Sequence, residues 1–135
     1  MPAQLASIDA AEGRTGDATA MLERARRGYE ERLARHPEAY GDHAARFWMG
    51  VGADPARAET LAQANLALRQ SEPAYQLAVE AALAAGDRAG ACRTADASSK
   101  SEHRGKPLLA AEWRAYTACG QKAQADAIDV LLARR

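Results

Sequence analysis

Residues 73–120, PAYQLAVEAALAAGDRAGACRTADASSKSEHRGKPLLAAEWRAYTACG, contain a pattern that recurs at a spacing of 34 residues and decides the fold. The matches are a proline, a glycine and four alanines: Pro73 with Pro107, Gly86 with Gly120, Ala81 with Ala115, Ala84 with Ala118, Ala89 with Ala123, and Ala91 with Ala125. A fixed period of this length is typical of stacked helical hairpins. Each unit is therefore expected to start a helix at its proline, turn at its glycine and end in a second helix.

The composition predicts a single all-α domain. A chain of 135 residues can build one continuous core but not two independent ones. Apolar residues make up 47% of the chain but aromatic residues only 5%, so alanine supplies much of the apolar fraction. Valine, isoleucine and threonine are scarce, which disfavours strands.

The charge balance and the hydropathy of the chain limit the classes of binding partner that are expected. Acidic and basic residues balance at 18 each, so the usual electrostatic argument for nucleic acid is missing and no nucleic-acid partner is expected. No stretch approaches the roughly 20 apolar residues of a membrane span, so no membrane span is expected either. The first residues lack the pattern of a signal peptide, and without a visible targeting segment the cytoplasm is the default location.

Four glycines mark the expected hairpin turns. Gly13, Gly52, Gly86 and Gly120 are spaced 39, 34 and 34 residues apart, and glycine tolerates the left-handed conformation that closes a helix. The chain is thus predicted to hold four antiparallel hairpins over about residues 2–35, 37–69, 73–100 and 107–134, within one domain spanning 1–135.

This pattern resembles the tetratricopeptide-repeat family, whose units are 34-residue helix–turn–helix hairpins. The residues that carry the resemblance are Val79 and Trp113 seven before a turn glycine, Ala82 and Tyr116 four before it, and Ala18, Ala91 and Ala125 five after it. The family usually has an aromatic residue in each second helix, where this chain has Ala95 and Asp129. The resemblance covers the whole chain loosely and residues 73–134 best, and it implies a right-handed superhelix with an inner groove.

The same resemblance implies which residues line that groove, because the family lines it with the first helix of each hairpin. Carried over residue by residue, the partner-binding groove presents Asp42, Arg46, Met49, Gln76, Glu80, Leu83, Arg114 and Thr117. One hypothesis is that Arg46 and Arg114 receive acidic groups of a bound peptide. The alternative is that both arginines pair with nearby Glu or Asp side chains and do nothing further.

Two further groups of residues leave alternatives open. Phe47, Trp48 and Met49 are expected in the core of the second hairpin, although at least one should lie near its surface; the alternative is an exposed anchor for a partner. Cys92 and Cys119 are expected to approach each other, as buried thiols or as a disulfide that would imply an oxidising compartment. Buried thiols are favoured, because cysteine often serves as a small apolar residue.

Nothing in the sequence predicts an enzyme, a metal site or a cofactor. The polar stretch 98–106 contains serines and His103 but is predicted to be an exposed loop without the fixed geometry that catalysis needs. The three histidines share no metal-ligand spacing, and no phosphate-binding loop appears.

The sequence therefore predicts a non-catalytic module that binds a peptide or a partner helix in a groove. The alternative is a structural segment that self-associates through its ends, since stacked repeats need a polar outer face at each end and the last predicted helix has none after it. Another copy, a partner or missing repeats could cover such an end. Binding of a small ligand between hairpins is a third and weaker hypothesis, because few polar groups converge.

Overall fold

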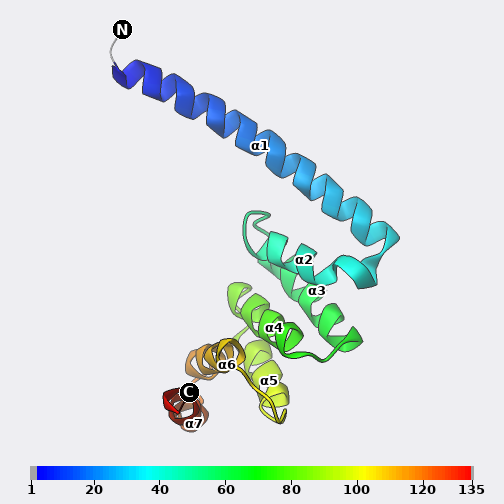
Figure 1. Cartoon of the computed structure of the whole chain (residues 1–135), viewed down its shortest axis with the longest axis vertical. Helices are drawn as coiled ribbons and strands as arrows, with labels where there is room; N and C mark the ends of the chain where they lie inside the picture. The colour runs from blue at the N-terminus through cyan, green and yellow to red at the C-terminus, as the bar shows by residue number, and fades with distance from the viewer. Residues whose placement is uncertain (1–2, 135) are drawn as a thin grey trace.

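The computed structural model describes the backbone of residues 3–134 and the side chains from Thr15 to Arg134. Within that range the chain forms seven helices and no strand (Figure 1): α1 (Ala3–Arg35), α2 (Pro37–Met49), α3 (Pro55–Leu68), α4 (Glu72–Ala84), α5 (Arg88–Ser98), α6 (Lys106–Ala118) and α7 (Lys122–Ala133). The predicted all-α class is confirmed. None of the described helices is both long and apolar enough to cross a membrane.

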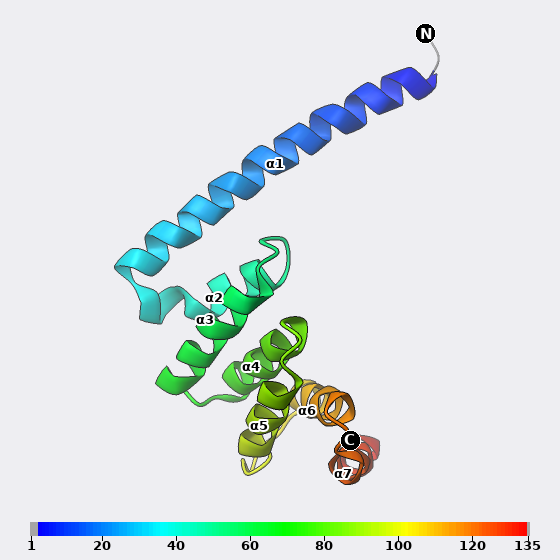
Figure 2. The ribbon, with the colours of Figure 1, turned by 180° about the vertical axis from the view of Figure 1, so that it is seen from behind.

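The first predicted hairpin is wrong, because the chain does not turn at Gly13. α1 is one helix of 33 residues, about 50 Å long, that runs through Gly13 and through Ala18. Glycine inside a helix costs only about 1 kcal/mol relative to alanine, and no proline follows Gly13 to force the helix to end. Pro2, the expected start of that hairpin, lies outside the described residues. The first half of α1 projects from the rest of the molecule (Figures 1 and 2).

The other three expected turns are present. α2 and α3, α4 and α5, and α6 and α7 pair as three successive hairpins that reverse near Gly52, Gly86 and Gly120. Gly86 and Gly120 adopt φ of +76° and +78°, the left-handed conformation that glycine tolerates. The next residue in each case returns its N–H to a helix carbonyl, Asp87 to Ala82 and Gln121 to Tyr116, both at 2.9 Å.

Gly52 is required at its turn for a steric reason and not for its backbone conformation. A Cβ at this position would lie 2.7 Å from the ring of Phe47, so the turn requires the absence of a side chain. The left-handed residue here is Ala53, with φ of 53°. Phe47 thereby packs directly against the backbone of its own turn.

Caps and prolines fix where the helices start. Pro37, Pro55, Pro73 and Pro107 all lie in the first turn of a helix, as their fixed φ favours. The side chains of Asp54, Ser71 and Asp87 accept hydrogen bonds from the N–H groups of Arg57, Ala74 and Gly90. These local signals explain why the helices begin close to the residues at which the sequence predicts them to begin.

Two apolar clusters hold the hairpins together. The first joins α1, α2, α3 and α4, and it contains Phe47 and Trp48, which are 8% and 2% exposed. The second joins α4 to α7, and its larger members include Val79, Leu109, Tyr116 and Ile128. The predicted core position of Phe47 and Trp48 is therefore confirmed, and Met49 is the half-buried member of the three.

The second half of α1 is held to the first cluster by an aromatic and ionic contact. The ring centroid of Tyr29 lies 4.9 Å from that of Phe47 and 6.1 Å from that of Trp48. Glu30 forms a two-pronged pair with Arg57, whose guanidinium carbon also lies 4.0 Å from the Trp48 ring centroid. This hydrogen bond to Arg57 lowers the pKa of Glu30 from its ordinary value.

The different roles of the glycines can be tested by two alanine substitutions. Gly16→Ala should raise the helix content measured by far-UV circular dichroism, because Gly16 lies inside α1 and an added Cβ would meet nothing within 4 Å. Gly86→Ala should lower the free energy of unfolding by about 1–2 kcal/mol, because it forces an L side chain into the left-handed region. A loss of helix content in Gly16→Ala would place a turn within α1 and contradict the continuous helix.

Candidate functional site

The surface that the sequence predicts as a groove is formed by α2, α4 and α6. The eight residues fall at three equivalent positions of the 34-residue period: Asp42 and Gln76, then Arg46, Glu80 and Arg114, then Met49, Leu83 and Thr117. All eight are exposed or half-buried, and none is fully buried. Within one helix the three positions are separated by four and three residues, so they lie along one helix face.

The structure brings the central three residues together as a charge ladder (Arg46, Glu80 and Arg114). Nη1 of Arg46 lies 3.8 Å from Oε1 of Glu80, and Nη2 of Arg114 lies 3.3 Å from Oε2 of the same carboxylate. Each contact joins residues 34 positions apart, so one carboxylate on α4 links α2 to α6. Two guanidinium groups share one carboxylate, which leaves the ladder with a net positive charge.

The ladder is accessible from solvent. The side chains of Arg46 and Arg114 are 50% and 51% exposed, whereas that of Glu80 is 21% exposed. Ion pairs at this exposure contribute only about 0–1 kcal/mol, so little is lost when another acidic group displaces one of them. The expected pairing of both arginines with a nearby acidic residue is thus present in the structure, and it leaves their outer donors free to meet a ligand.

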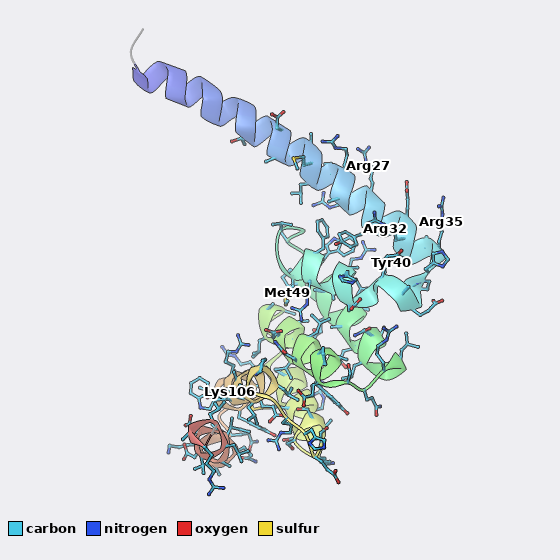
Figure 3. All side chains as sticks on the ribbon, in the orientation of Figure 1. Arg27, Arg32, Arg35, Tyr40, Met49 and Lys106 are labelled. Atoms are coloured by element: carbon cyan, nitrogen blue, oxygen red, sulfur yellow. A yellow bond between two sulfur atoms is a disulfide. The ribbon has the colours of Figure 1, made fainter. Side chains whose placement is uncertain are left out.

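The remaining predicted residues flank the ladder without joining it. Asp42 accepts a hydrogen bond of 2.8 Å from the backbone N–H of His43. Met49 and Leu83 each pack against one of the two apolar clusters while staying half-buried. Figure 3 shows Met49 at the end of α2 next to α4. The face therefore offers charged groups at its middle and apolar side chains beside them.

A hollow between α3 and α5 contains a pair of carboxyl groups that the sequence did not reveal. Glu59 and Asp87 line it together with Gln63, Arg93 and Thr94. Burial, a hydrogen bond to Asp87 and repulsion from the same group raise the pKa of Glu59 to about 7, against a weaker opposing effect of Arg93. The hydrogen bond with Glu59 also lowers the pKa of Asp87, so the pKa values of the two neighbouring carboxyl groups are shifted in opposite directions.

This pair makes stability depend on pH. The pKa of Glu59 is about 7 in the folded chain and 4.5 ordinarily, so between these values the folded state binds more protons than the unfolded state. The free energy of unfolding, measured by urea titration at pH 5, 6, 7 and 8, should therefore fall as pH rises through this window. Glu59→Gln should remove that fall, whereas Glu102→Gln, in the exposed part of the 99–105 loop, should keep it. An unchanged slope in Glu59→Gln would contradict the raised pKa of Glu59.

The polar connection after α5 is a loop with an exposed middle, as predicted, but hydrogen bonds hold both of its ends. Glu112 on α6 is 0% exposed, and its carboxylate accepts hydrogen bonds from Arg104 at 2.9 Å and from Ser98 at 2.5 Å. Arg104 also donates to the backbone carbonyl of Ser99, so the loop is fixed at both ends. Gly105 in addition donates its N–H to Glu72 of α4. The buried Ser98 is committed to this network and is inaccessible as a nucleophile.

The sequence contains a signal that could have revealed Glu112. It occupies the position of Ala44 and Ala78 in the two preceding hairpins, both of which are 0% exposed. An acidic residue at a core position requires a buried partner. Arg104, eight residues earlier in the loop, is one of the nearby basic residues that could meet that requirement.

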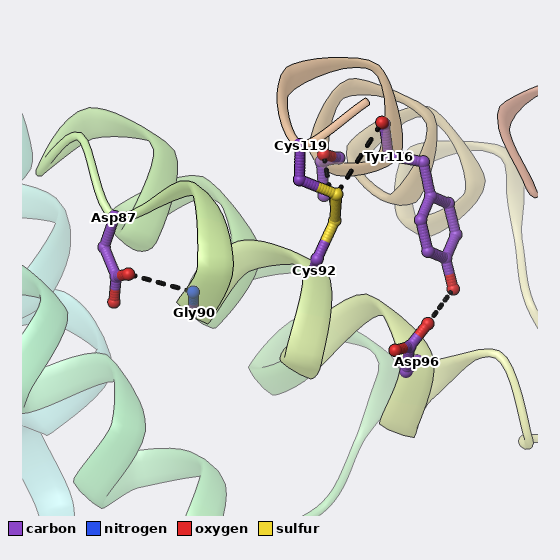
Figure 4. Close-up of a disulfide and its surroundings, with 7 residues drawn as sticks. Asp87, Gly90, Cys92, Asp96, Tyr116 and Cys119 are labelled. Atoms are coloured by element: carbon purple, nitrogen blue, oxygen red, sulfur yellow. Dashed lines mark hydrogen bonds between the residues drawn. A yellow bond between two sulfur atoms is a disulfide. The ribbon is translucent and has the colours of Figure 1, made fainter. Parts of the chain in front are cut away.

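Cys92 and Cys119 form a disulfide, so the expectation of two buried thiols is wrong. Their Cα atoms lie 6.5 Å apart, and the bond joins α5 to the end of α6 (Figure 4). Beside it, the hydroxyl of Tyr116 donates a hydrogen bond of 2.8 Å to Asp96, a second link between the same two helices. Burial and this hydrogen bond raise the pKa of Tyr116 to about 12. The predicted approach of the two cysteines is correct, but both thiols are consumed in the bond.

The disulfide should stabilise the folded chain measurably. Its cysteines are separated by 27 residues, and closing a loop of that length contributes about 3.5 kcal/mol in the chain-entropy description. Reduction, or Cys92→Ala combined with Cys119→Ala, should lower the free energy of unfolding in urea by about 2–4 kcal/mol. Dithiothreitol should leave the doubly substituted chain unaffected, which serves as the control. Two free thiols in unreduced, denatured protein would show that the bond is absent.

No group of three or more potential metal ligands occurs among the described side chains. The imidazole of His43 lies near one carboxylate, with its Nε2 4.0 Å from Oδ1 of Asp42. Comparison with known proteins adds no assignment: no protein family, curated protein or solved structure matches this chain.

Proposed function

We propose that this chain is a non-catalytic interaction module that binds a peptide or a partner helix on the face formed by α2, α4 and α6. The observation that carries the proposal is the charge ladder, which places two half-exposed arginines on either side of one glutamate. The 34-residue period and the three stacked hairpins fit the proposed resemblance to tetratricopeptide repeats, in which the corresponding face forms the inner groove of a superhelix.

The ladder favours an acidic ligand. Two guanidinium groups against one carboxylate attract a further negative charge, and arginine can hold a carboxylate through two parallel hydrogen bonds. The half-buried Met49 and Leu83 lie about one helical turn away, so apolar side chains of the same ligand can pack beside the charged contact. An extended peptide with one or two acidic residues next to an apolar residue matches this surface.

The disulfide bears on the location of this activity. Disulfides persist mainly in oxidising compartments and are rare in the reducing cytosol. We therefore infer that the module works in an oxidising compartment, in place of the cytoplasm taken as the default from the sequence.

Binding of acidic peptides by paired variants tests the function. The probes are fluorescein-labelled ten-residue peptides with two Glu residues beside a Leu, and matched peptides with Gln in place of Glu. Arg46→Gln combined with Arg114→Gln should weaken binding of the acidic peptides about fivefold or more, because each exposed pair contributes up to about 1 kcal/mol. Fluorescence anisotropy at low and high salt measures the effect, which should shrink as salt screens the charges.

The matched control removes the same charge elsewhere. Arg88→Gln combined with Arg134→Gln changes two exposed arginines on α5 and at the end of α7, away from the ladder. This control should bind the acidic peptides as the unchanged protein does. Equal affinity of both double variants for the acidic peptides would refute the role of the ladder.

A further inference from the structure

The last hairpin carries a second hollow, distinct from the charge ladder. This terminal hollow measures about 230 Å³ and lies between α6 and α7, where it is lined by Trp113, Tyr116, Thr117, Ala125, Asp126 and Asp129 among others. α7 lies at the end of the stack of hairpins, away from α2 and α3 (Figures 1 and 2). The hollow is smaller than the roughly 300 Å³ at which pockets for small molecules begin, so it suits a few side chains better than a whole ligand.

The 34-residue period identifies the residues of the preceding hairpin that are equivalent to those lining the terminal hollow. The residues 34 positions earlier are Val79, Ala82, Ala91, Cys92 and Ala95, at the positions of Trp113, Tyr116, Ala125, Asp126 and Asp129. These earlier residues are only 0–9% exposed, because they form one cluster with Leu109, Ala111 and Ala115 of α6. The terminal hollow is therefore the place on the last hairpin where a further helix would pack, as α6 packs on α4 and α5.

Two residues that line the terminal hollow are acidic where the preceding hairpin has uncharged residues. Asp126 stands where the preceding hairpin has Cys92, and Asp129 stands where it has Ala95. Both aspartates are exposed, and the contact of 3.1 Å between Asp126 and Lys122 joins two largely solvated side chains. Trp113, which is 36% exposed, supplies an apolar edge. A helix that packs here must therefore match the aromatic side chains of Trp113 and Tyr116 and two carboxylates together.

We propose that the terminal hollow seats an amphipathic helix of a partner protein, with Lys or Arg side chains directed at Asp126 and Asp129. The preceding hairpin indicates where those basic residues lie on the guest. Cys92 meets Cys119 at the end of α6, so the residue that faces Asp126 lies near the C-terminus of the guest helix, where the helix dipole also favours a cation. This contact uses none of the three ladder residues, although Thr117 belongs both to the predicted groove and to the terminal hollow.

A peptide based on the sequence of α6 can serve as a probe for the terminal hollow. Residues 106–119 are synthesised with Glu112→Arg and Cys119→Arg as the basic peptide. The matched peptide carries Glu112→Ala and Cys119→Ala; it is named neutral for its two substituted positions, and both peptides keep Lys106 and Arg114. Position 112 is chosen because Glu112 lies close to Ala95, which occupies the position of Asp129 in the preceding hairpin. The hydroxyl of Ser98 connects the two: it lies 2.5 Å from the Glu112 carboxylate and 3.1 Å from the carbonyl of Ala95. Both peptides carry a fluorescein label for anisotropy measurements on the oxidised full chain.

The basic peptide should bind about fivefold more tightly than the neutral one, because two exposed ion pairs each contribute up to about 1 kcal/mol. Asp126→Asn combined with Asp129→Asn should reduce its affinity to that of the neutral peptide. Asp17→Asn combined with Glu102→Gln makes the same change of net charge on α1 and in the 99–105 loop, and should leave the affinity unchanged. Arg46→Gln with Arg114→Gln should also leave it unchanged, which separates this seat from the ladder.

Three results would overturn the proposal. The first is equal affinity of the basic and neutral peptides, including the absence of binding by either. The second is an equal loss in the Asp17 and Glu102 control, which would indicate attraction by net charge alone. The third is a dimer in sedimentation equilibrium that is lost in the Asp126 and Asp129 variant, since a second copy of the chain would then occupy the seat.

Discussion

Contact between alanine-lined helix faces is the constraint on which the rest of this structure depends. The fully buried residues include Ala44, Ala45, Ala58, Ala62, Ala78, Ala81, Ala82, Ala91, Ala95, Ala111 and Ala115, all at 0% exposure. Alanine favours helix and loses no side-chain entropy on burial, so it gives regular helices that approach closely. Each alanine, however, removes little apolar surface from water, and burial contributes only about 0.8 kcal/mol per methylene-sized group. The stack therefore relies on a few stronger anchors between the alanine faces.

Those anchors differ from one hairpin to the next. Near the N-terminal end they are Trp48, Phe47 and the pair of Arg57 with Glu30, which hold the second half of α1. Near the C-terminal end they are the disulfide and the buried contact of Glu112 with Arg104. A buried carboxylate is costly without its partner, by about 3–5 kcal/mol when a pair is broken, so this contact fixes the 99–105 loop and with it the position of α6. The spacing of Arg114 from Glu80 depends on that position.

The same 34-residue period that builds the core also places the surface groups. Residues at equivalent positions of α2, α4 and α6 lie side by side, so a change of residue type along the series becomes a feature of the surface. The charge ladder arises because basic, acidic and basic residues follow one another at one position. The terminal hollow arises because the last hairpin has no described helix packed where α6 packs on the preceding one, and because two of its seat residues have become aspartates. Both surface features of this chain can thus be traced to single positions of its 34-residue period.

Local chemistry in the sequence determined where six of the seven helices lie. Prolines in the first turn, capping Asp and Ser residues and glycines with positive φ act within a few residues, so they can be interpreted without knowledge of the fold. The resemblance to a repeat family, carried over residue by residue, implied that Arg46, Glu80 and Arg114 share one face before their contacts were known. The resemblance to a repeat family, and the superhelix that it implies, stay predictions.

Only the tertiary structure decided the remaining features, because each depends on groups far apart in the chain. Gly13 resembles the other turn glycines in sequence, but the backbone of α1 continues through it as one helix. The raised pKa of Glu59 depends on Asp87 in the next hairpin, and the pairing of Glu112 depends on how the loop folds back. The sequence placed Cys92 and Cys119 near each other, but only the packing of α5 against α6 brings their sulfur atoms to bonding distance.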